Sequence, residues 1–235
     1  MAVIINSVID LSHHNAIDFQ QVAGDGVLGV IHKATQGVTF TDPTYNSRKQ
    51  EAADAGLLWG AYHFGDGSDP VAQADRFLDI VKPDAATLIA LDFEPNTLKT
   101  AGPAGQTMNL AGAEAFVNRI NENLGTFPGL YCSPGFLKQQ LGSKTDSPLK
   151  NCWLWIAHYT TAPAPTVPLL WQDWTLWQYT DGNKGAQPHT VQGVGKCDRD
   201  RFNGDQAGLQ ALWGVAGDQG VTPDNGAADS ATSGG

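Results

Sequence analysis

The first half of the chain repeats one arrangement, in which a short apolar run is followed by a longer, more polar segment. The apolar runs span residues 3–10, 27–34, 57–64, 86–93 and 128–133. Runs of this length, bounded by turn residues, indicate buried strands. Because strands that alternate with helices form right-handed βαβ units, the repeat predicts a parallel sheet covered by helices.

Two of the intervening segments carry clear signals of a helix start. In 69–81, Asp69 can accept hydrogen bonds from the first backbone N–H groups, and Pro70 suits the first helical position. In 109–124, Asn109 can cap the helix in the same way. Apolar residues recur at helical spacing after each cap, so both segments are predicted to be helices with one buried face.

The last third of the domain follows a different pattern. Strand-like runs recur at 152–159, 174–180 and 193–202, but the segments between them are rich in Pro, Gly and Thr. Such segments favour loops and hairpins over helices. We therefore predict one α/β barrel of the TIM-like (β/α) type, with βα repeats first and an irregular, mostly β, closing part.

The composition indicates where the domain ends and which classes of partner it does not suit. After Trp213 the residues are mostly small or polar, so we predict one domain over 1–213 and a flexible tail or linker remnant over 214–235. The formal net charge of -10 argues against a nucleic acid backbone or an anionic membrane as partner. No apolar stretch reaches the ~20 residues of a membrane helix. The N-terminus lacks the features of a secretory signal, so we expect none.

Acidic and aromatic residues gather at the predicted strand ends. Active sites of α/β barrels lie at the C-terminal ends of the strands. Four carboxylates from three strands would meet there, and they are Asp10, Asp92, Glu94 and Asp198. Aromatic residues at the same ends are Tyr62, Tyr131, Trp177 and Tyr179, and His13 follows the first strand. Aromatic rings suit the apolar faces of sugars, so we expect these residues to bind a carbohydrate.

Asp92 and Glu94 form the most informative pair. They lie two positions apart on one strand, so both side chains point to the same face, with Cα atoms about 6.6 Å apart at ~3.3 Å rise per residue. Proximity and burial would raise the pKa of one of them. An acid that keeps its proton beside an ionised neighbour is what glycoside hydrolysis requires.

A D-x-E pair at a strand end also has other uses, as a metal ligand, a helix cap or a solvated turn. Several carboxylates together could bind Mg²⁺ or Ca²⁺. However, the chain has no EF-hand loop, and Cys132, Cys152 and Cys197 form no C-x-x-C pair. We therefore expect neither a metal nor another cofactor, and we expect the cysteines to be reduced and buried.

Six motifs in order resemble one known family. "VIDLSHHN" contains Asp10, "LDFEP" contains Asp92 and Glu94, and "CDRDRFNG" contains Asp198. Residues 30–64, "LWIAHY" and "LWQYT" fit between them. Together they resemble glycoside hydrolase family 25, the lysozymes or N-acetylmuramidases, over residues 8–204. The resemblance implies a flattened, modified barrel and cleavage of the β-1,4 bond between N-acetylmuramic acid and N-acetylglucosamine in peptidoglycan.

The resemblance also implies roles for individual residues. Glu94 would be the general acid, and Asp92 would orient the substrate's N-acetyl group or stabilise the oxocarbenium-like centre. Asp10 and Asp198 would complete the acidic site. Tyr62, Trp177 and Tyr179 would line the sugar groove. We favour the substrate's 2-acetamido oxygen as the nucleophile, with retention of configuration, although an i, i+2 spacing does not decide between mechanisms.

Two positions depart from the family pattern. Gln36 stands where the family often has Glu, and "CDRDRF" offers Asp200 as an alternative to Asp198. Two other functions stay open from the sequence. One is a wall-binding module without turnover. The other is a different barrel glycosidase such as a chitinase, although "ATLIAL" before Asp92 lacks the longer acidic run typical of chitinases.

The expected partner is the glycan strand of peptidoglycan, bound by a monomer. Such a protein acts on the bacterial cell wall. The absence of a recognisable signal fits a phage or prophage endolysin released from the cytoplasm, and a wall-remodelling enzyme or a secreted effector whose signal is missing also fits.

Overall fold

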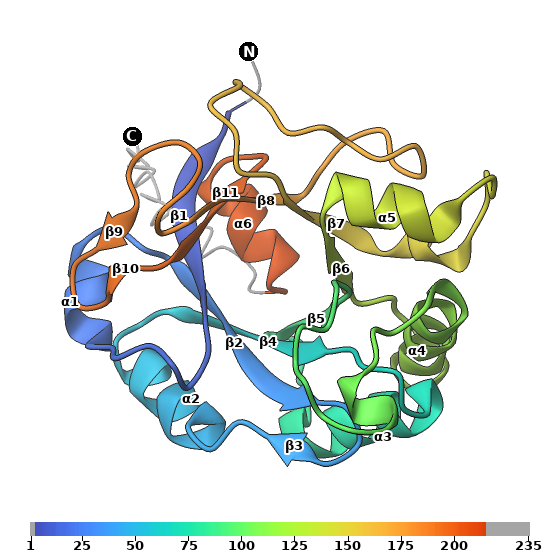
Figure 1. Cartoon of the computed structure of the whole chain (residues 1–235). Coiled ribbons are helices and arrows are strands. Elements are labelled where there is room, and N and C mark those ends of the chain that lie inside the picture. The colour runs from blue at the N-terminus through green and yellow to red at the C-terminus, as the bar shows by residue number, and fades with distance from the viewer. Residues whose placement is uncertain (1–2, 215–235) are drawn as a thin grey trace, which may run out of the picture.

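The computed structural model describes residues 3–214, and eight of its strands close into a barrel (Figure 1). The barrel closes because β1 pairs with both β2 and β11. In chain order the strands are β1 (Ile5–Leu11), β2 (Gly29–Gln36), β4 (Leu58–Phe64), β5 (Leu88–Asp92), β6 (Gly129–Cys132), β7 (Trp153–Ala157), β8 (Leu176–Asp181) and β11 (Asp198–Phe202). The first seven of these strands pair with one another in parallel. The last strand, β11, closes the barrel by pairing antiparallel with β8 and β1.

The first part of the barrel is built from βα repeats, as predicted. The helices are α1 (Phe19–Gly24), α2 (Tyr45–Asp54), α3 (Pro70–Val81), α4 (Leu110–Leu124), α5 (Pro134–Leu141) and α6 (Gln206–Leu212). Single 3₁₀ turns are η1 (Pro103–Gly105) and η2 (Pro148–Asn151). Asp69 and Asn109 cap α3 and α4, because their side chains accept hydrogen bonds from first-turn N–H groups.

The closing part is irregular and mostly β, also as predicted. Within the described residues, no helix separates β7 from β8 or β8 from β11. The second of these connections carries a small hairpin of β9 (Thr190–Val191) and β10 (Gly195–Lys196). A further short strand, β3 (Phe40–Thr41), pairs with the end of β2. The expectation of a modified α/β barrel is therefore confirmed.

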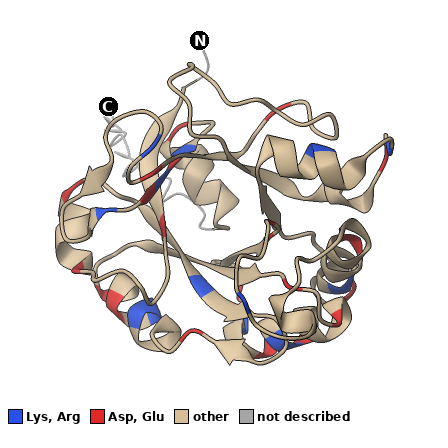
Figure 2. Cartoon of the chain, viewed as in Figure 1, with Lys and Arg blue, Asp and Glu red and all other residues tan. Residues whose placement is uncertain are grey.

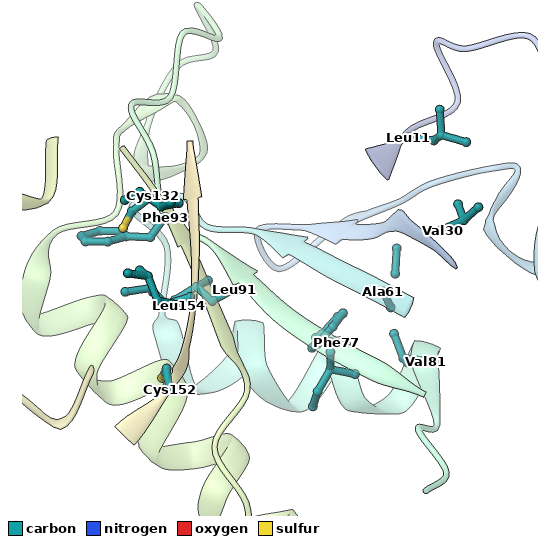
Figure 3. Packing of buried hydrophobic residues seen from close by; sticks show 14 of the residues in the cluster. Leu11, Val30, Ala61, Phe77, Val81, Leu91, Phe93, Cys132, Cys152 and Leu154 are labelled. Carbon is teal, nitrogen blue, oxygen red and sulfur yellow. The ribbon is translucent and has the colours of Figure 1, made fainter. Parts of the chain in front are cut away.

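Two separate apolar layers hold the barrel together. The outer layer lies between the strands and the surrounding helices, where Leu91 of β5 and the following Phe93 lie and Phe77 projects from α3 (Figure 3). The inner layer fills the barrel itself and includes Val8, Ile31, Leu88, Leu176 and Phe202. Strand side chains alternate between these layers, so each strand contributes to both.

Helix α6 closes one end of the barrel, an element that the sequence pattern did not indicate. Its Leu209 and the following Trp213 belong to the inner apolar layer, and α6 crosses the barrel axis in Figure 1. Gly29, at the start of β2, makes room for this closure, because a Cβ there would lie 3.3 Å from the Trp213 ring. The plug therefore lies where the parallel strands begin, and the opposite end of the barrel stays open.

The predicted boundary at Trp213 falls at the end of this plug. Gly214 is the last described residue, so the predicted tail over 214–235 lies outside the described residues except for its first residue. Within the described range, Cys132, Cys152 and Cys197 are buried and free, as expected. In that range no helix has the length and apolar character needed to cross a membrane.

Candidate active site

Strand alternation places the predicted carboxylates inside the open end of the barrel. On β5, Leu88 and Ala90 belong to the inner apolar layer, so Asp92 two residues later faces inward as well. On β1, Val8 belongs to the same layer and Asp10 follows it. Asp10 pairs directly with Asp198 of β11, across the antiparallel closure of the barrel. Glu94 lies just beyond β5, after the outward-facing Phe93.

These residues line one cavity of about 190 Å³. Its lining residues are Asp10, Tyr62, Asp92, Glu94, Tyr131, Trp155, Tyr159, Gln178 and Asp198. The structure thus brings together all four predicted carboxylates and two of the four predicted aromatic residues. Most other charged side chains lie on the helices and loops around the barrel (Figure 2). The cavity is therefore a concentrated acidic site at the position where barrel enzymes hold their active sites.

A hydrogen-bond relay fixes Asp10 at the cavity wall. The Gln178 amide Nε2 donates to Asp10 Oδ2 at 2.6 Å. The Gln178 carbonyl oxygen in turn accepts hydrogen bonds from the hydroxyls of Tyr131, at 2.8 Å, and Tyr159, at 2.6 Å. Because both ends of the amide are engaged, its orientation is determined, and Asp10 is held in one position.

Asp200 lies beneath the cavity and does not line it. It is fully buried, and its Oδ1 accepts a hydrogen bond of 2.6 Å from Trp155 Nε1. Its other oxygen, Oδ2, is buried and has no hydrogen-bond partner among the described residues. Burial raises the pKa of Asp200 to about 8, and burial together with repulsion from Asp198 and Asp200 raises that of Asp10 well above its usual value. The structure therefore distinguishes the two candidates, because Asp198 lines the cavity and Asp200 is buried behind it.

Asp92 and Glu94 have different surroundings. Asp92 is 7% exposed, and its buried Oδ1 has no hydrogen-bond partner among the described residues. Burial and the nearby charge of Glu94 raise the pKa of Asp92 well above its usual value. Glu94 is only partly buried, and burial raises its pKa, while the charge of Lys33 opposes this shift. The pair therefore joins an enclosed carboxyl to a more accessible one at the mouth.

Asp198 completes the acidic cluster on the opposite wall. Burial raises its pKa to about 7, and the charges of Asp181 and Glu94 add to this effect. Several carboxyls of raised pKa thus share one cavity. Such a site can donate a proton to a leaving oxygen and stabilise positive charge at the same time.

Trp177 and Tyr179 do not line the cavity, so the prediction that they line the sugar groove is wrong. Both are fully buried in the outer apolar layer, on the other face of β8 from Gln178. Trp177 Nε1 donates to the carbonyl of His158 at 2.8 Å, and the Tyr179 hydroxyl donates to the carbonyl of Pro188 at 2.9 Å. Side chains alternate along a strand, so "WQY" can present only its middle residue to the cavity.

His13 also lies outside the cavity. It borders a neighbouring depression together with Lys33, Phe40 and Phe64. Its Nδ1 lies 2.8 Å from Asp42 Oδ2, and its backbone N–H donates to the same oxygen at 2.9 Å. This double contact ties His13 to the loop before α2, which explains its position without a bound sugar.

Three cavity residues were not among the predicted site residues. For Trp155 the sequence predicts packing in the core, because Trp155 shares a strand face with Trp153. That face points into the barrel, and Trp155 lies far enough toward the open end of β7 to line the acidic cavity. The sequence does not show how far along the strand the apolar core ends and the cavity begins. Gln178 and Tyr159 carry no catalytic motif. Their function as a relay depends on contacts between residues that lie far apart in the sequence.

The cavity shows no sign of a metal centre within residues 3–214. No group of three or more His, Cys, Asp or Glu side chains in that range has an arrangement that could hold a metal ion.

A barrel with paired carboxyls at its open end defines an α/β-barrel glycoside hydrolase. The model of the family described as "Glycosyl hydrolases family 25" matches residues 9–187. The chain belongs to this family, and it is therefore a glycoside hydrolase enzyme. The family resemblance inferred from the motifs is confirmed, and the matched range includes Asp10, Asp92 and Glu94.

Curated relatives and solved structures agree with this assignment. Lysozyme M1 of Streptomyces globisporus is 31% identical over 216 residues, which cover 87% of this chain and 70% of that protein. N,O-diacetylmuramidase of Chalaropsis sp is 28% identical, covering 72% and 85%. A bacterial lysozyme structure from Streptomyces coelicolor superimposes with a TM-score of 0.76 at 29% identity, covering 92% and 99%. A family GH25 lysozyme from Aspergillus fumigatus gives 0.74 at 29% identity, covering 92% and 100%.

Proposed function

We propose that this enzyme is a lysozyme that hydrolyses the β-1,4 bond between N-acetylmuramic acid and N-acetylglucosamine in peptidoglycan. The observation that carries the proposal is the pairing of Asp92 and Glu94 in one acidic cavity of about 190 Å³. The similarity to lysozymes and to N,O-diacetylmuramidases supports this choice of substrate. The partner is thus the glycan strand of the cell wall, and we propose that a monomer binds it.

Glu94 is the proposed general acid. It lies at the mouth of the cavity, where a glycosidic oxygen can approach, and burial keeps its pKa raised. A carboxyl group with a raised pKa remains protonated long enough to donate to the leaving oxygen as the bond breaks. Its partial exposure distinguishes it from Asp92, which is enclosed.

Asp92 is the proposed partner of the substrate's N-acetyl group. Its Oδ1 is buried and lacks a hydrogen-bond partner, and a buried acceptor without a donor is unfavourable. The amide N–H of a 2-acetamido group would supply that donor. Asp92 would then orient the acetamido oxygen for attack on the anomeric carbon, with retention of configuration. Detection of inverted anomers as the first product would rule out this step.

The remaining residues would shape the sugar site. Asp10 is held by the Gln178 relay and Asp198 faces it, so both can bind sugar hydroxyl groups. Tyr62, Tyr131 and Trp155 provide aromatic surface on the wall between β4 and β7. Rigid polar groups and aromatic rings of this kind orient a sugar before the reaction.

The test compares wild-type protein with Glu94→Gln on purified peptidoglycan. Wild-type protein should clear a cell-wall suspension and release reducing sugar. The variant should still sediment with walls but release at least ~10²-fold less sugar, because the proton donor is lost. Wall binding without sugar release by the wild-type protein would identify a binding module instead. Faster turnover of chitin oligomers than of peptidoglycan would favour the chitinase alternative.

The site of action follows from the substrate. A family 25 lysozyme acts on the bacterial cell wall. We propose that residues 1–213 form the catalytic domain, because α6 and Trp213 complete the barrel interior. Either release from the cytoplasm as an endolysin or secretion would bring this domain to the wall.

A further inference from the structure

The neighbouring depression that His13 borders is large enough for a ligand of its own. Its volume is about 430 Å³, within the ~300–1,000 Å³ range of pockets that bind small molecules. Its walls include the side chains of Lys33, Gln36, Phe40 and Phe64. None of these residues lines the acidic cavity, so the catalytic site does not account for them.

Strand pairing places this depression directly beside the acid pair. Phe64 of β4 lines the depression, and its register partner on β5 is Asp92, which lines the cavity. Lys33 of β2 lines the depression, and its register partner on β4 is Tyr62, which lines the cavity. The two hollows therefore adjoin at the open end of the barrel, and a substrate held in the cavity can extend into the depression.

The ammonium group of Lys33 has unused bonding capacity. Nζ donates a hydrogen bond of 2.6 Å to Gln36 Oε1 and lies 4.7 Å from the centre of the Phe64 ring and 5.6 Å from that of Phe40. An ammonium has three N–H donors, and across residues 3–214 no carboxylate oxygen lies within 4.0 Å of this one. Because the side chain is partly buried, a bound anion would stabilise its charge.

The acid that shares the depression is already engaged. Asp66 is buried, and its Oδ1 accepts hydrogen bonds from the backbone N–H of Ser68, at 2.8 Å, and from the Ser68 hydroxyl. The carboxyls of the adjoining cavity would repel an anion, so a negatively charged part of a substrate is stabilised here only close to Lys33. The depression thus suits a ligand with a carboxylate and apolar atoms.

The chemistry of the proposed substrate supplies such a group. In N-acetylmuramic acid, the carbon next to the one that bears the acetamido group carries a lactyl ether, and a peptide stem with free carboxylates is joined to it. If Asp92 holds the acetamido group, the stem leaves the sugar beside Asp92. The strand next to Asp92 there presents Phe64, the wall of the depression.

We propose that the neighbouring depression binds the acidic peptide stem of peptidoglycan, with Lys33 Nζ pairing with a stem carboxylate and Phe40 and Phe64 packing on its apolar atoms. This proposal rests on the proposed lysozyme function and adds to it a site that selects substrates by the charge of the stem. Lys33 is thus a specificity-determining residue that contacts the peptide part of the substrate.

Gln36 keeps this site open. Its amide oxygen holds Lys33 Nζ in place but carries no charge, so the ammonium remains available to an anion. Glu, which the family often has at this position, would put a carboxylate against the same nitrogen. That ion pair would compete with the stem, so Gln36 ties the proposed selectivity to this particular chain.

The test compares kcat/KM of the full chain on two forms of one substrate. The first is purified peptidoglycan strands without cross-links. The second is the same material after carbodiimide treatment in excess ammonium, which converts the stem carboxylates to neutral amides. The readout is the ratio of kcat/KM on the native form to that on the amidated form, so a general loss of activity cancels.

Wild-type protein should favour the native form by about tenfold, at the low end for a hydrogen bond to a charged group because Lys33 is partly exposed. Lys33→Met should reduce the ratio to one or below, and Lys33→Arg should keep it near the wild-type value. Gln36→Glu should also lower the ratio, and it retains the lysine if Lys33→Met fails to fold. Lys138→Met is the matched control, because it removes an exposed lysine that borders a different pocket, and its ratio should equal that of wild type.

Two results would overturn the proposal. One is a wild-type protein that cleaves both forms equally well. The other is a Lys33→Met protein, or a Gln36→Glu protein if the first does not fold, whose ratio stays at the wild-type value. An uncharged sugar in the depression would give the first result. A wild-type protein that releases no reducing sugar from either form would instead refute the proposed function, so the two failures are distinguishable.

Discussion

The two halves of the barrel interior differ sharply although the same strand faces build both. Near the α6 plug, the inward positions are apolar, as at Val8 of β1 and Ala90 of β5. Two residues further along these strands, the inward positions are Asp10 and Asp92. A step of two residues, about 6.6 Å along a strand, separates a packed core from an acidic site.

The comparison shows how a small domain can place several acids side by side. Carboxyls of like charge repel, and burying them costs free energy. The apolar half and the outer layer fix the strands, so the acidic half keeps its arrangement despite that cost. Stability and chemistry are therefore assigned to different ends of the same strands, and variants at the two ends should have opposite effects.

The largest expected effect belongs to the apolar half. Trp213→Ala removes the buried ring that packs over Gly29, and it should lower the free energy of unfolding by about 3–5 kcal/mol. Activity per folded molecule should change little, because the ring lies at the closed end. Urea unfolding followed by tryptophan fluorescence measures the change. Leu169→Ala is the control, since Leu169 is 98% exposed. Equal effects of the two substitutions would show that the plug does not support the barrel.

Asp92→Asn is the corresponding change in the acidic half. It keeps the shape of the side chain but removes its charge, so kcat should fall about 10²–10³-fold, as for other electrostatic groups in active sites. The unfolding free energy should stay the same or increase, because a buried carboxyl with a raised pKa is replaced by a neutral amide. Steady-state rates on peptidoglycan and thermal unfolding test both parts. Retention of full activity would remove Asp92 from the mechanism.

The variant Asp200→Asn tests how the acidic half affects the pH dependence of stability. The pKa of Asp200 is raised to about 8 from 3.8, so between these values the native state binds more protons than the unfolded state, and stability falls as pH rises. Asn keeps the shape of the side chain and can accept from Trp155 without ionising. The variant should therefore lose at least about 1.4 kcal/mol less stability between pH 5 and pH 9 than wild type. Parallel stability curves for the two proteins would contradict the raised pKa of Asp200.

Two tyrosines give the smallest and most closely matched pair of predictions. Tyr131 donates to Gln178 on the inner face, and Tyr179 donates to Pro188 on the outer face. Replacing either with Phe should cost about 0.5–1.5 kcal/mol of stability, the usual worth of one hydrogen bond. Only Tyr131→Phe should also lower kcat, because it loosens the relay to Asp10. A lower kcat for Tyr179→Phe would restore that residue to the site.

Much of the fold was predictable because its signals are local. The strand runs, the caps Asp69 and Asn109, and the change of pattern from residue 152 onward all have signals within short stretches of sequence. The positions of Asp10, Asp92 and Glu94 followed from strand ends and alternation. Helix α6 was missed because seven residues carry too little periodicity, and its burial depends on a gap left by Gly29 on a distant strand.

The errors in the site have a common physical cause. Trp177 and Tyr179 lie within β8 and not at its C-terminal end, and the face they occupy depends on the register of β8 against β7 and β11. Register is set by pairing between distant segments, and one residue of difference moves every side chain to the other face. Trp155 differs, because it does belong to the inner apolar layer and only its position near the open end also brings it to the cavity. Strand ends can be read from one sequence, whereas the inward face requires the closed barrel.

The most direct test of the central claim is the chemistry of the released fragments. Purified peptidoglycan is digested, the new reducing ends are reduced with borohydride, and the products are identified by mass spectrometry. Cleavage by the Asp92–Glu94 site as proposed predicts fragments that end in reduced N-acetylmuramic acid, absent from the Glu94→Gln digest. Fragments that end in reduced N-acetylglucosamine, or equal release by both proteins, would contradict it.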